Sequence, residues 1–246
     1  MAITFNSNKL GGRQRTIWRG EAKMLPGGFK LLQDFPAGTL LERGAPVFIN
    51  MSDLSGAICK VGTVITGGTT TKPRVSKNNN FVVGDIVTKV GHGEKSPSIS
   101  AIDRSNDAYD VVTLSAAYTG LTAGDMLVES TEYGYYDAES GDEGALKVVA
   151  SDATTGQINL ASVTPYKGEK TLAANDYVVL KLAEPLYVPN AILGEDREIL
   201  ASDLPTIDVA WGALVIKDVA PAIPASWMAD GGICLKNNHN IVYIRQ

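Results

Sequence analysis

Residues 123–127 read Ala-Gly-Asp-Met-Leu, and the pattern behind this short phrase decides the fold that we expect. A small residue, then Gly or Asn, then Asp or Thr, leads into an apolar run, and the same order recurs at 37–41, 83–87 and 174–178. Gly and Asn tolerate positive φ, and an Asp or Thr after them can hydrogen-bond neighbouring backbone N–H groups before a strand begins. Each copy therefore predicts a turn that is followed directly by a β-strand.

The chain around these copies has the same texture from residue 35 to residue 182. Short apolar or β-branched runs alternate with Gly, Asn, Asp and Ser about every eight to twelve positions, which is typical of β-sandwich and β-barrel domains. Helical turns fit only 195–201 and 218–228. We predict an all-β fold with a short-strand sandwich or barrel body, and strands at 39–41, 46–50, 57–64, 86–90, 111–115, 126–129, 146–150, 157–161 and 177–182.

The two ends of the chain differ from this body. Residues 1–30 carry six Lys and Arg against one Glu, a net charge of +5 in a chain whose total is −5, and they show no sustained periodicity. They predict an extended basic arm that docks either on its own body or on an acidic neighbouring subunit. Residues 183–246 hold five of the 11 Pro, so we expect strands at 209–216 and 241–245 between Pro-fixed loops.

The predicted organisation therefore has three parts. The arm covers residues 1–30, the β body covers 31–182 and can split into two subdomains near residue 91, and the Pro-rich segment covers 183–246. Neither an apolar signal-peptide region nor a run long enough to span a bilayer is visible in the sequence, so we expect a soluble protein with no membrane partner.

The composition excludes several kinds of chemistry. The chain has 246 residues, 44% of them apolar, which suits one or two ordinary core-forming domains. Its two thiols, Cys59 and Cys234, are too far apart for a local metal motif, and His92 and His239 are the only imidazoles. We expect buried thiols, histidines in loops with structural or exposed roles, and no metal, cofactor or catalytic residue. The familiar local enzyme signatures are also missing.

Two features leave alternatives open. The acidic stretch 129–143 suits a solvated loop, a cation site or the carboxylate pair of a glycosidase. Beside it, Tyr133, Tyr135 and Tyr136 either stack on sugars or lie on alternate faces of an edge strand. A glycan- or host-surface-binding adhesin is therefore the alternative function, and a glycosidase or depolymerase is the less favoured one. The basic arm suits phosphate contacts, but it has no nucleic-acid motif, so we expect no nucleic-acid partner.

Several phrases together point to a family. They are Arg-Thr-Ile-Trp-Arg-Gly at 15–20, Pro-Ala-Gly-Thr at 36–39, Arg-Gly-Ala-Pro-Val at 43–47 and Leu-Tyr-Val-Pro-Asn-Ala-Ile-Leu-Gly at 186–194. With the Gly-Asp-led strands, they resemble the head-fibre and capsid decoration proteins of tailed phages of gut Bacteroidales, including the crAss-like group. The resemblance implies a β-rich structural protein of the virion that binds the major capsid protein at one end and is exposed at the other.

The same resemblance implies a homotrimer on the capsid exterior, assembled in the host cytoplasm, that stabilises the shell or aids adhesion without enzymatic activity. Within the arm, we expect Arg13, Arg15, Trp18 and Arg19 to dock on the capsid, because this segment combines positive charge with a lack of core periodicity. The three tyrosines named above remain the candidates for surface glycan contact.

Overall fold

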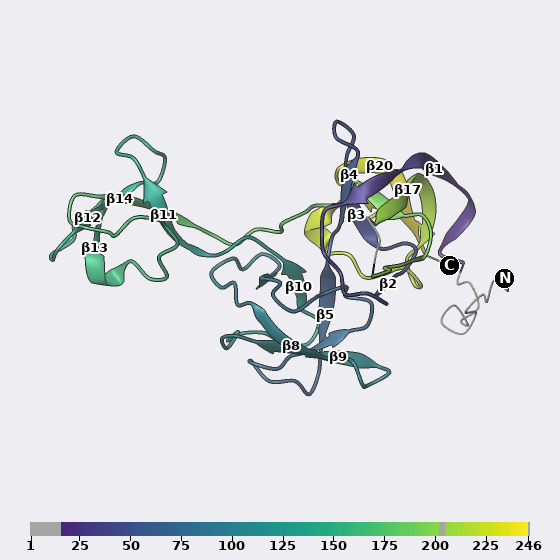
Figure 1. Cartoon of the computed structure of the whole chain (residues 1–246), viewed down its shortest axis with the longest axis horizontal. Coiled ribbons are helices and arrows are strands. Elements are labelled where there is room, and N and C mark those ends of the chain that lie inside the picture. Colours follow the sequence, from purple (N-terminus) through teal and green to yellow (C-terminus); the bar gives the residue numbers. More distant parts are fainter. Residues whose placement is uncertain (1–15, 202–204, 246) are drawn as a thin grey trace. The chain divides into compact units, whose positions relative to one another are not determined.

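The computed structural model describes residues 16–201 and 205–245 and confirms the all-β prediction, with 44% strand and 3% helix (Figure 1). The described residues contain no helix long and apolar enough to cross a lipid bilayer. The chain forms two compact units. Unit 1 consists of residues 1–59 and 188–246, and unit 2 consists of residues 60–187, inserted between two strands of unit 1.

This division differs from the expected three parts because strand pairing joins the two ends of the chain. From residue 18 on, the expected arm is strand β1 (Trp18–Leu31), which runs antiparallel to β17 (Thr206–Ile216) from Trp18↔Val215 to Lys30↔Thr206. Phe29 and Leu31 are buried in this strand although its basic residues are exposed. The segment is extended as expected, and it docks on its own unit.

Unit 1 is built around a closed ring of five strands in the order β1-β4-β3-β15-β17, since β1 pairs with both β4 and β17. The β1–β4 pairing that closes the ring is short and covers only Lys30↔Ser55 and Leu31↔Gly56. The side of β17 that faces away from β1 also pairs with β20, and β19 and β18 follow. The bounds are β3 (Pro46–Asn50), β4 (Ser55–Ile58), β15 (Ala191–Leu193), β18 (Met228–Ala229), β19 (Cys234–Leu235) and β20 (Asn238–Ile244).

The chain leaves and re-enters unit 1 on the two sides of β3. Ile58 of β4 and Ala191 of β15 are both register partners of Val47. The side chain of Asn190 supplements this pairing, because its Oδ1 accepts from the Ile49 N–H at 2.8 Å and its Nδ2 donates to the Ile49 carbonyl at 2.9 Å. The strands that flank the insertion are therefore held by β3 itself.

Unit 2 begins with a six-stranded sheet in the order β7-β10-β5-β6-β9-β8. An antiparallel bridge between Ile86 and Ser98 joins its two outer ends, so this sheet also curves into a ring. Its core contains Phe81, Ile99 and Leu127, all buried. The bounds are β5 (Val61–Ile65), β6 (Arg74–Ser76), β7 (Val87–Lys89), β8 (Ile99–Asp103), β9 (Tyr109–Leu114) and β10 (Met126–Glu129).

A second, four-stranded sheet completes unit 2 in the order β11-β14-β12-β13. Val148 and Val178 are fully buried in its small core, with Ile158 and Val163 beside them. The boundary between the two sheets lies after residue 129, not near residue 91 as expected, because β8 and β9 pair back onto the first sheet. The bounds are β11 (Gly134–Ala138), β12 (Leu146–Val149), β13 (Gln157–Asn159) and β14 (Tyr177–Lys181).

The four turn phrases adopt one geometry, which confirms their sequence prediction. The Gly or Asn of each phrase has positive φ, from 78° at Asn175 to 99° at Gly84. In three copies the following Asp accepts a hydrogen bond from the backbone N–H three residues earlier, at 2.7–2.8 Å: Asp85 from Val82, Asp125 from Thr122 and Asp176 from Ala173. Gln157 does the same for Thr154 at 3.2 Å, a fifth copy that the sequence pattern did not reveal.

Most other expectations concern element boundaries. The strand expected at 57–64 is divided at Cys59 and Lys60 into β4 and β5, which belong to different units. The helical turn considered at 195–201 is wrong: β16 (Arg197–Glu198) pairs there with β2 (Leu40–Leu41). Within 218–228 the structure has one short 3₁₀ turn, Ala225–Trp227, and another, Leu160–Ser162, follows β13. The strands β1, β6, β8, β15, β18 and β19 were not expected, and β11 was considered only as an alternative for the three tyrosines.

A buried ionic triad lies where unit 2 begins. The Lys60 Nζ atom lies 2.7 Å from Asp85 Oδ1 and 3.0 Å from Glu129 Oε1, and the Lys60 side chain is 2% exposed. Lys60 is the residue before β5, Asp85 lies in the turn before β7, and Glu129 is the last residue of β10. Charges so far from water are tolerated only when paired, so each member depends on the others.

We therefore expect Lys60→Met to destabilise unit 2 by about 3–5 kcal/mol, because it leaves two carboxylates without their buried cation. Hydrogen exchange of the β5 and β10 amides would measure the loss. Lys89→Met is the matched control: its partner Asp125 lies 2.9 Å away in a pair that is 17–18% exposed, so the expected cost is below about 1 kcal/mol. Equal protection in both variants would contradict the importance of the triad.

Asp125 predicts a pH dependence. Burial pushes the pKa of its carboxyl upward, but hydrogen bonds from Lys89 and Thr122 outweigh it and hold the pKa below its ordinary value. The stabilisation by Asp125 is thus present above the unfolded pKa of about 3.9 and is lost as pH falls through the folded pKa. Urea denaturation should show a stability gap between wild type and Asp125→Asn at pH 7 that narrows below about pH 4. The pH dependence would be contradicted if the difference in unfolding free energy between wild type and Asp125→Asn were unchanged at pH 3. It would also be contradicted if the exposed control Asp107→Asn showed an equally large difference.

Candidate docking surface

The N-terminal end of β1 is fixed by Ile17. Its side chain is buried, and its carbonyl accepts a hydrogen bond from the Ile216 N–H at 2.7 Å. The Ile17 side chain lies against Gly44, whose φ is +84° and where a Cβ atom would come within 2.7 Å of Ile17 Cγ2. Gly44 in turn donates its N–H to the Leu193 carbonyl at 2.8 Å. The chain is thus anchored in unit 1 at the residue before β1.

Trp18 is engaged within unit 1. It packs, half-buried, against the core cluster that contains Ile192 and Ile241. The Arg43 guanidinium carbon lies 4.9 Å from the centroid of the Trp18 ring, and the backbone N–H of Arg43 donates to Asp196 Oδ1 at 2.7 Å. A cation over an aromatic face is a stabilising contact. Trp18, predicted to dock on the capsid, therefore already has an aromatic-face partner inside its own unit.

Arg19 is the described docking candidate that faces solvent. It is the register partner of Leu214, which is 46% exposed, and Leu214 is the partner of Val242 on β20. Directly opposed residues in a sheet project from the same face. Arg19, Leu214 and Val242 therefore form a strip across three strands, which we call the outer strip. The other two docking candidates, Arg13 and Arg15, lie outside the described residues.

The three tyrosines do not share one face. Tyr135 packs against the core of the four-stranded sheet, and Tyr136 is the next residue of the same strand, so it points to the opposite side. The Tyr136 hydroxyl donates to the Glu132 carbonyl at 3.0 Å, and the Lys181 Nζ atom lies 4.9 Å from its ring centroid. The N–H of Tyr133 donates to the Ser96 hydroxyl. Tyr135 and Tyr136 therefore lie on alternate faces of β11.

The acidic stretch 129–143 is bound to its own unit. Glu132 pairs with Lys167 at 3.2 Å, while Asp137 accepts hydrogen bonds from the Tyr166 hydroxyl and, at 2.9 Å, from the Glu169 N–H. The bond from Tyr166 is the main cause that lowers the pKa of Asp137. Burial, followed by the same bond, raises the pKa of Tyr166 to about 12. Glu132 and Asp137 are therefore held by contacts within unit 2.

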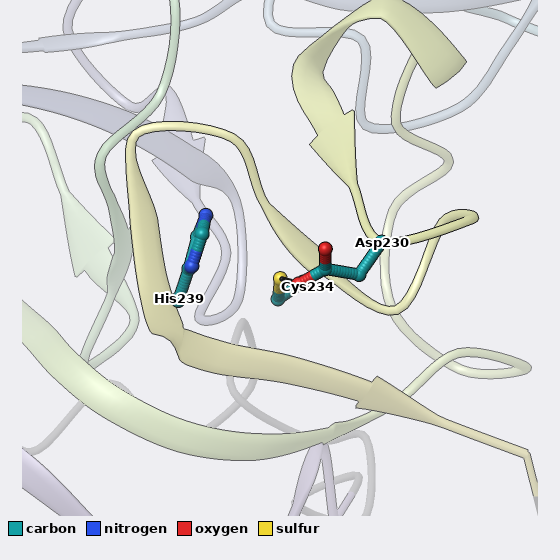
Figure 2. Close-up of side chains that lie close together, drawn as sticks. All are labelled: Asp230, Cys234 and His239. Atoms are coloured by element: carbon teal, nitrogen blue, oxygen red, sulfur yellow. Dashed lines mark hydrogen bonds between the residues drawn. The ribbon is translucent and has the colours of Figure 1, made fainter.

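The described residues bring together one group of three metal-ligand types, Asp230, Cys234 and His239, whose ligand atoms all lie within 4.8 Å of one another (Figure 2). Cys59 and Cys234 are buried as expected. Burial, with a hydrogen bond to Asp230, raises the pKa of the Cys234 thiol. The sequence expectation treated Cys234 and His239 separately. The signal that could have joined them was Asp-Gly-Gly at 230–232, a turn between two short β-type runs.

Comparison with known proteins finds no family model, no curated protein and no solved structure that matches the chain.

The two units differ in net charge. Unit 1 has equal numbers of acidic and basic side chains, so the whole net charge of −5 belongs to unit 2. The positive end of unit 1 is its N-terminal sequence, which leads to Ile17 and the outer strip.

The anchoring of Ile17 can be tested at Gly44. Gly44→Ala should destabilise unit 1 by about 2–5 kcal/mol, because it adds both left-handed strain and a collision with Ile17. Gly20→Ala is the matched control in β1: its φ is +73° but nothing lies within 4 Å of an added Cβ, so only about 1–2 kcal/mol is expected. All three Trp belong to unit 1, so Trp fluorescence during denaturation reports on this unit. Equal losses in the two variants would mean that Ile17 moves aside freely.

Proposed function

We propose that this chain is a structural protein of a tailed-phage particle, which binds the outer surface of the capsid through unit 1 and helps to stabilise the shell. The observation that carries the proposal is that four phrases resembling head-fibre and decoration proteins, at 15–20, 36–39, 43–47 and 186–194, belong almost entirely to unit 1, although the Gly-Asp-led strands that share the resemblance belong mainly to unit 2. Their shared function is then attachment, and the inserted unit 2 is the exposed part of the particle surface.

The contacts between these phrases are direct. Leu193 donates its N–H to the Ala45 carbonyl at 2.8 Å, and Gly44 donates to Leu193 in return. Ile192 is the register partner of Pro46. Ile17 packs on Gly44, and the turn at 36–39 is tied to the same unit by the hydrogen bond from the Gly38 N–H to the Ile199 carbonyl at 2.7 Å. Phrases that are more than one hundred residues apart in the sequence are thus hydrogen-bonded to one another in unit 1.

The surface of unit 1 has the properties of an attachment surface. Arg19 and Leu214 of the outer strip combine a cation with an exposed apolar side chain, and Ile233 is 53% exposed in the same unit. Large apolar side chains beside Arg are typical of protein interfaces. Arg13 and Arg15 precede this strip in the sequence and add the positive charge that suits an acidic capsid surface. The exposed apolar side chains also support self-association, which we propose to be trimeric.

The proposal is tested on particles of the phage whose genome encodes this chain. Mass spectrometry of purified particles should detect the chain at a fixed ratio to the major capsid protein. Capsids stripped of it should then rebind the full chain, while deletion of residues 2–14, which keeps Ile17 and β1, should weaken binding at least about tenfold, since charged partners steer association. Light scattering of the free protein measures the proposed trimer.

A charge-matched variant controls for non-specific electrostatics. Lys72, Lys167 and Lys170 are exposed residues of unit 2, and changing all three to Gln removes the same number of charges as changing Lys9, Arg13 and Arg15. We expect the unit 2 variant to rebind like wild type and the N-terminal variant to fail. Absence of the chain from purified particles would overturn the function. Equal rebinding by both variants would overturn the docking role of the N-terminal sequence.

A further inference from the structure

The hairpin of β18, β19 and β20 places three metal-ligand types side by side (Figure 2). Asp230, Gly231 and Gly232 all have positive φ, from 50° to 88°, and this turn brings β19 back antiparallel to β18. Lys236 and Asn237 make the next connection, after which β20 runs antiparallel to β19. Asp230 on the first turn, Cys234 at the start of β19 and His239 on β20 are thereby neighbours in space.

The spacing of the three ligand atoms is close to that of a tetrahedral metal site. Zinc binds sulfur at about 2.3 Å and imidazole nitrogen or carboxylate oxygen at about 2.0–2.2 Å, which puts tetrahedral ligand atoms roughly 3.3–3.8 Å apart. Cys234 Sγ and Asp230 Oδ2 are 3.2 Å apart, and the largest separation in the group is 4.8 Å or less. The farthest pair needs to approach by about 1 Å. Asp230 and His239 are exposed, so their side chains are free to rotate by that amount.

We propose that Asp230, Cys234 and His239 bind one Zn²⁺ ion, with the fourth coordination position open to solvent. A thiolate, an imidazole and a carboxylate form a mixed set that zinc accepts, whereas Ca²⁺ and Mg²⁺ prefer oxygen ligands alone. In the metal-free protein the Cys234 thiol keeps its proton and donates a hydrogen bond to Asp230 Oδ2 at 3.2 Å. Metal binding releases this proton to solvent and puts Zn²⁺ between the sulfur and the carboxylate oxygen. No bond other than S–H is broken.

The burial of the group agrees with such a site. Cys234 is 3% exposed, so its sulfur lies on the protein side, while Asp230 and His239 lie on the solvent side. The buried Cys234 sulfur would therefore bind the ion on its protein side, and water would reach the ion on its solvent side. Because the ligands span the turn after β18 and the start of β20, the ion would cross-link the hairpin that extends the sheet of β17. This role is independent of capsid attachment.

The chain provides its own matched controls, because it has only two Cys and two His. We would prepare the full chain free of metal and measure Zn²⁺ stoichiometry and affinity by calorimetry, with Co²⁺ as a spectroscopic probe. Wild type, Cys59→Ser and His92→Asn should bind one ion per chain and show sulfur-to-cobalt charge-transfer absorption. Cys234→Ser should lose that absorption, and both Cys234→Ser and His239→Asn should weaken Zn²⁺ affinity at least about tenfold.

Thermal unfolding separates loss of the site from loss of the fold. Without metal, the thermal unfolding curve of each variant should resemble that of wild type. If the curve of Cys234→Ser does not, Cys234→Ala is used in its place. Excess Zn²⁺ should raise the melting temperature of wild type and Cys59→Ser but not that of the Cys234 and His239 variants. The proposal is overturned if wild type binds no Zn²⁺, if its cobalt spectrum lacks the sulfur band, or if Cys234 and His239 variants bind as tightly as Cys59→Ser.

Discussion

The pairing of β1 with β17 is the contact on which unit 1 depends. It joins Trp18 to Val215 and Lys30 to Thr206, so the first and last parts of the chain form one ring. Without it, β1 and β17 would each expose a row of unpaired backbone groups, and the outer strip of Arg19, Leu214 and Val242 would not exist. The entropy of closing a chain grows only slowly with its length, so the long intervening segment is tolerated thermodynamically. Correct closure nevertheless requires that both chain ends be present before unit 1 can form.

Unit 2 meets the requirements of such an insertion, because it has its own cores and its own polar centre. The Lys60 triad is made entirely within it, from its first residue to the end of β10, and the Asp-led turns set the starts of its strands with local hydrogen bonds. None of these interactions needs a partner from unit 1. The two units consequently keep separate tasks, with attachment assigned to one and the outward surface to the other in the function that we propose.

The sequence predicted the turns that residues adjacent in the chain form. It did not predict the contacts that depend on which distant strands pair. The turns at Gly84, Gly124 and Asn175 follow from residues that are adjacent in the chain, so their geometry was predictable. β1 contains Pro26 and several Gly, and it is a strand because it pairs with β17 along its length and with β4 at its end, which is why its sequence resembled an arm. The position of Trp18 under Arg43 and the grouping of Cys234 with His239 likewise depend on strands that return from elsewhere. Side-chain identity suggested the candidates, but topology determined their neighbours.

The junction around Val47 has a consequence for the insertion. Ile58 and Ala191 face this residue from opposite sides, so the chain leaves unit 1 and returns to it across two strand spacings, or about 10 Å. A gap of that size is bridged by a short loop as readily as by a folded domain. We therefore expect that residues 60–187 can be replaced by another folded domain, or by a short loop, without loss of the strand pairing around Val47.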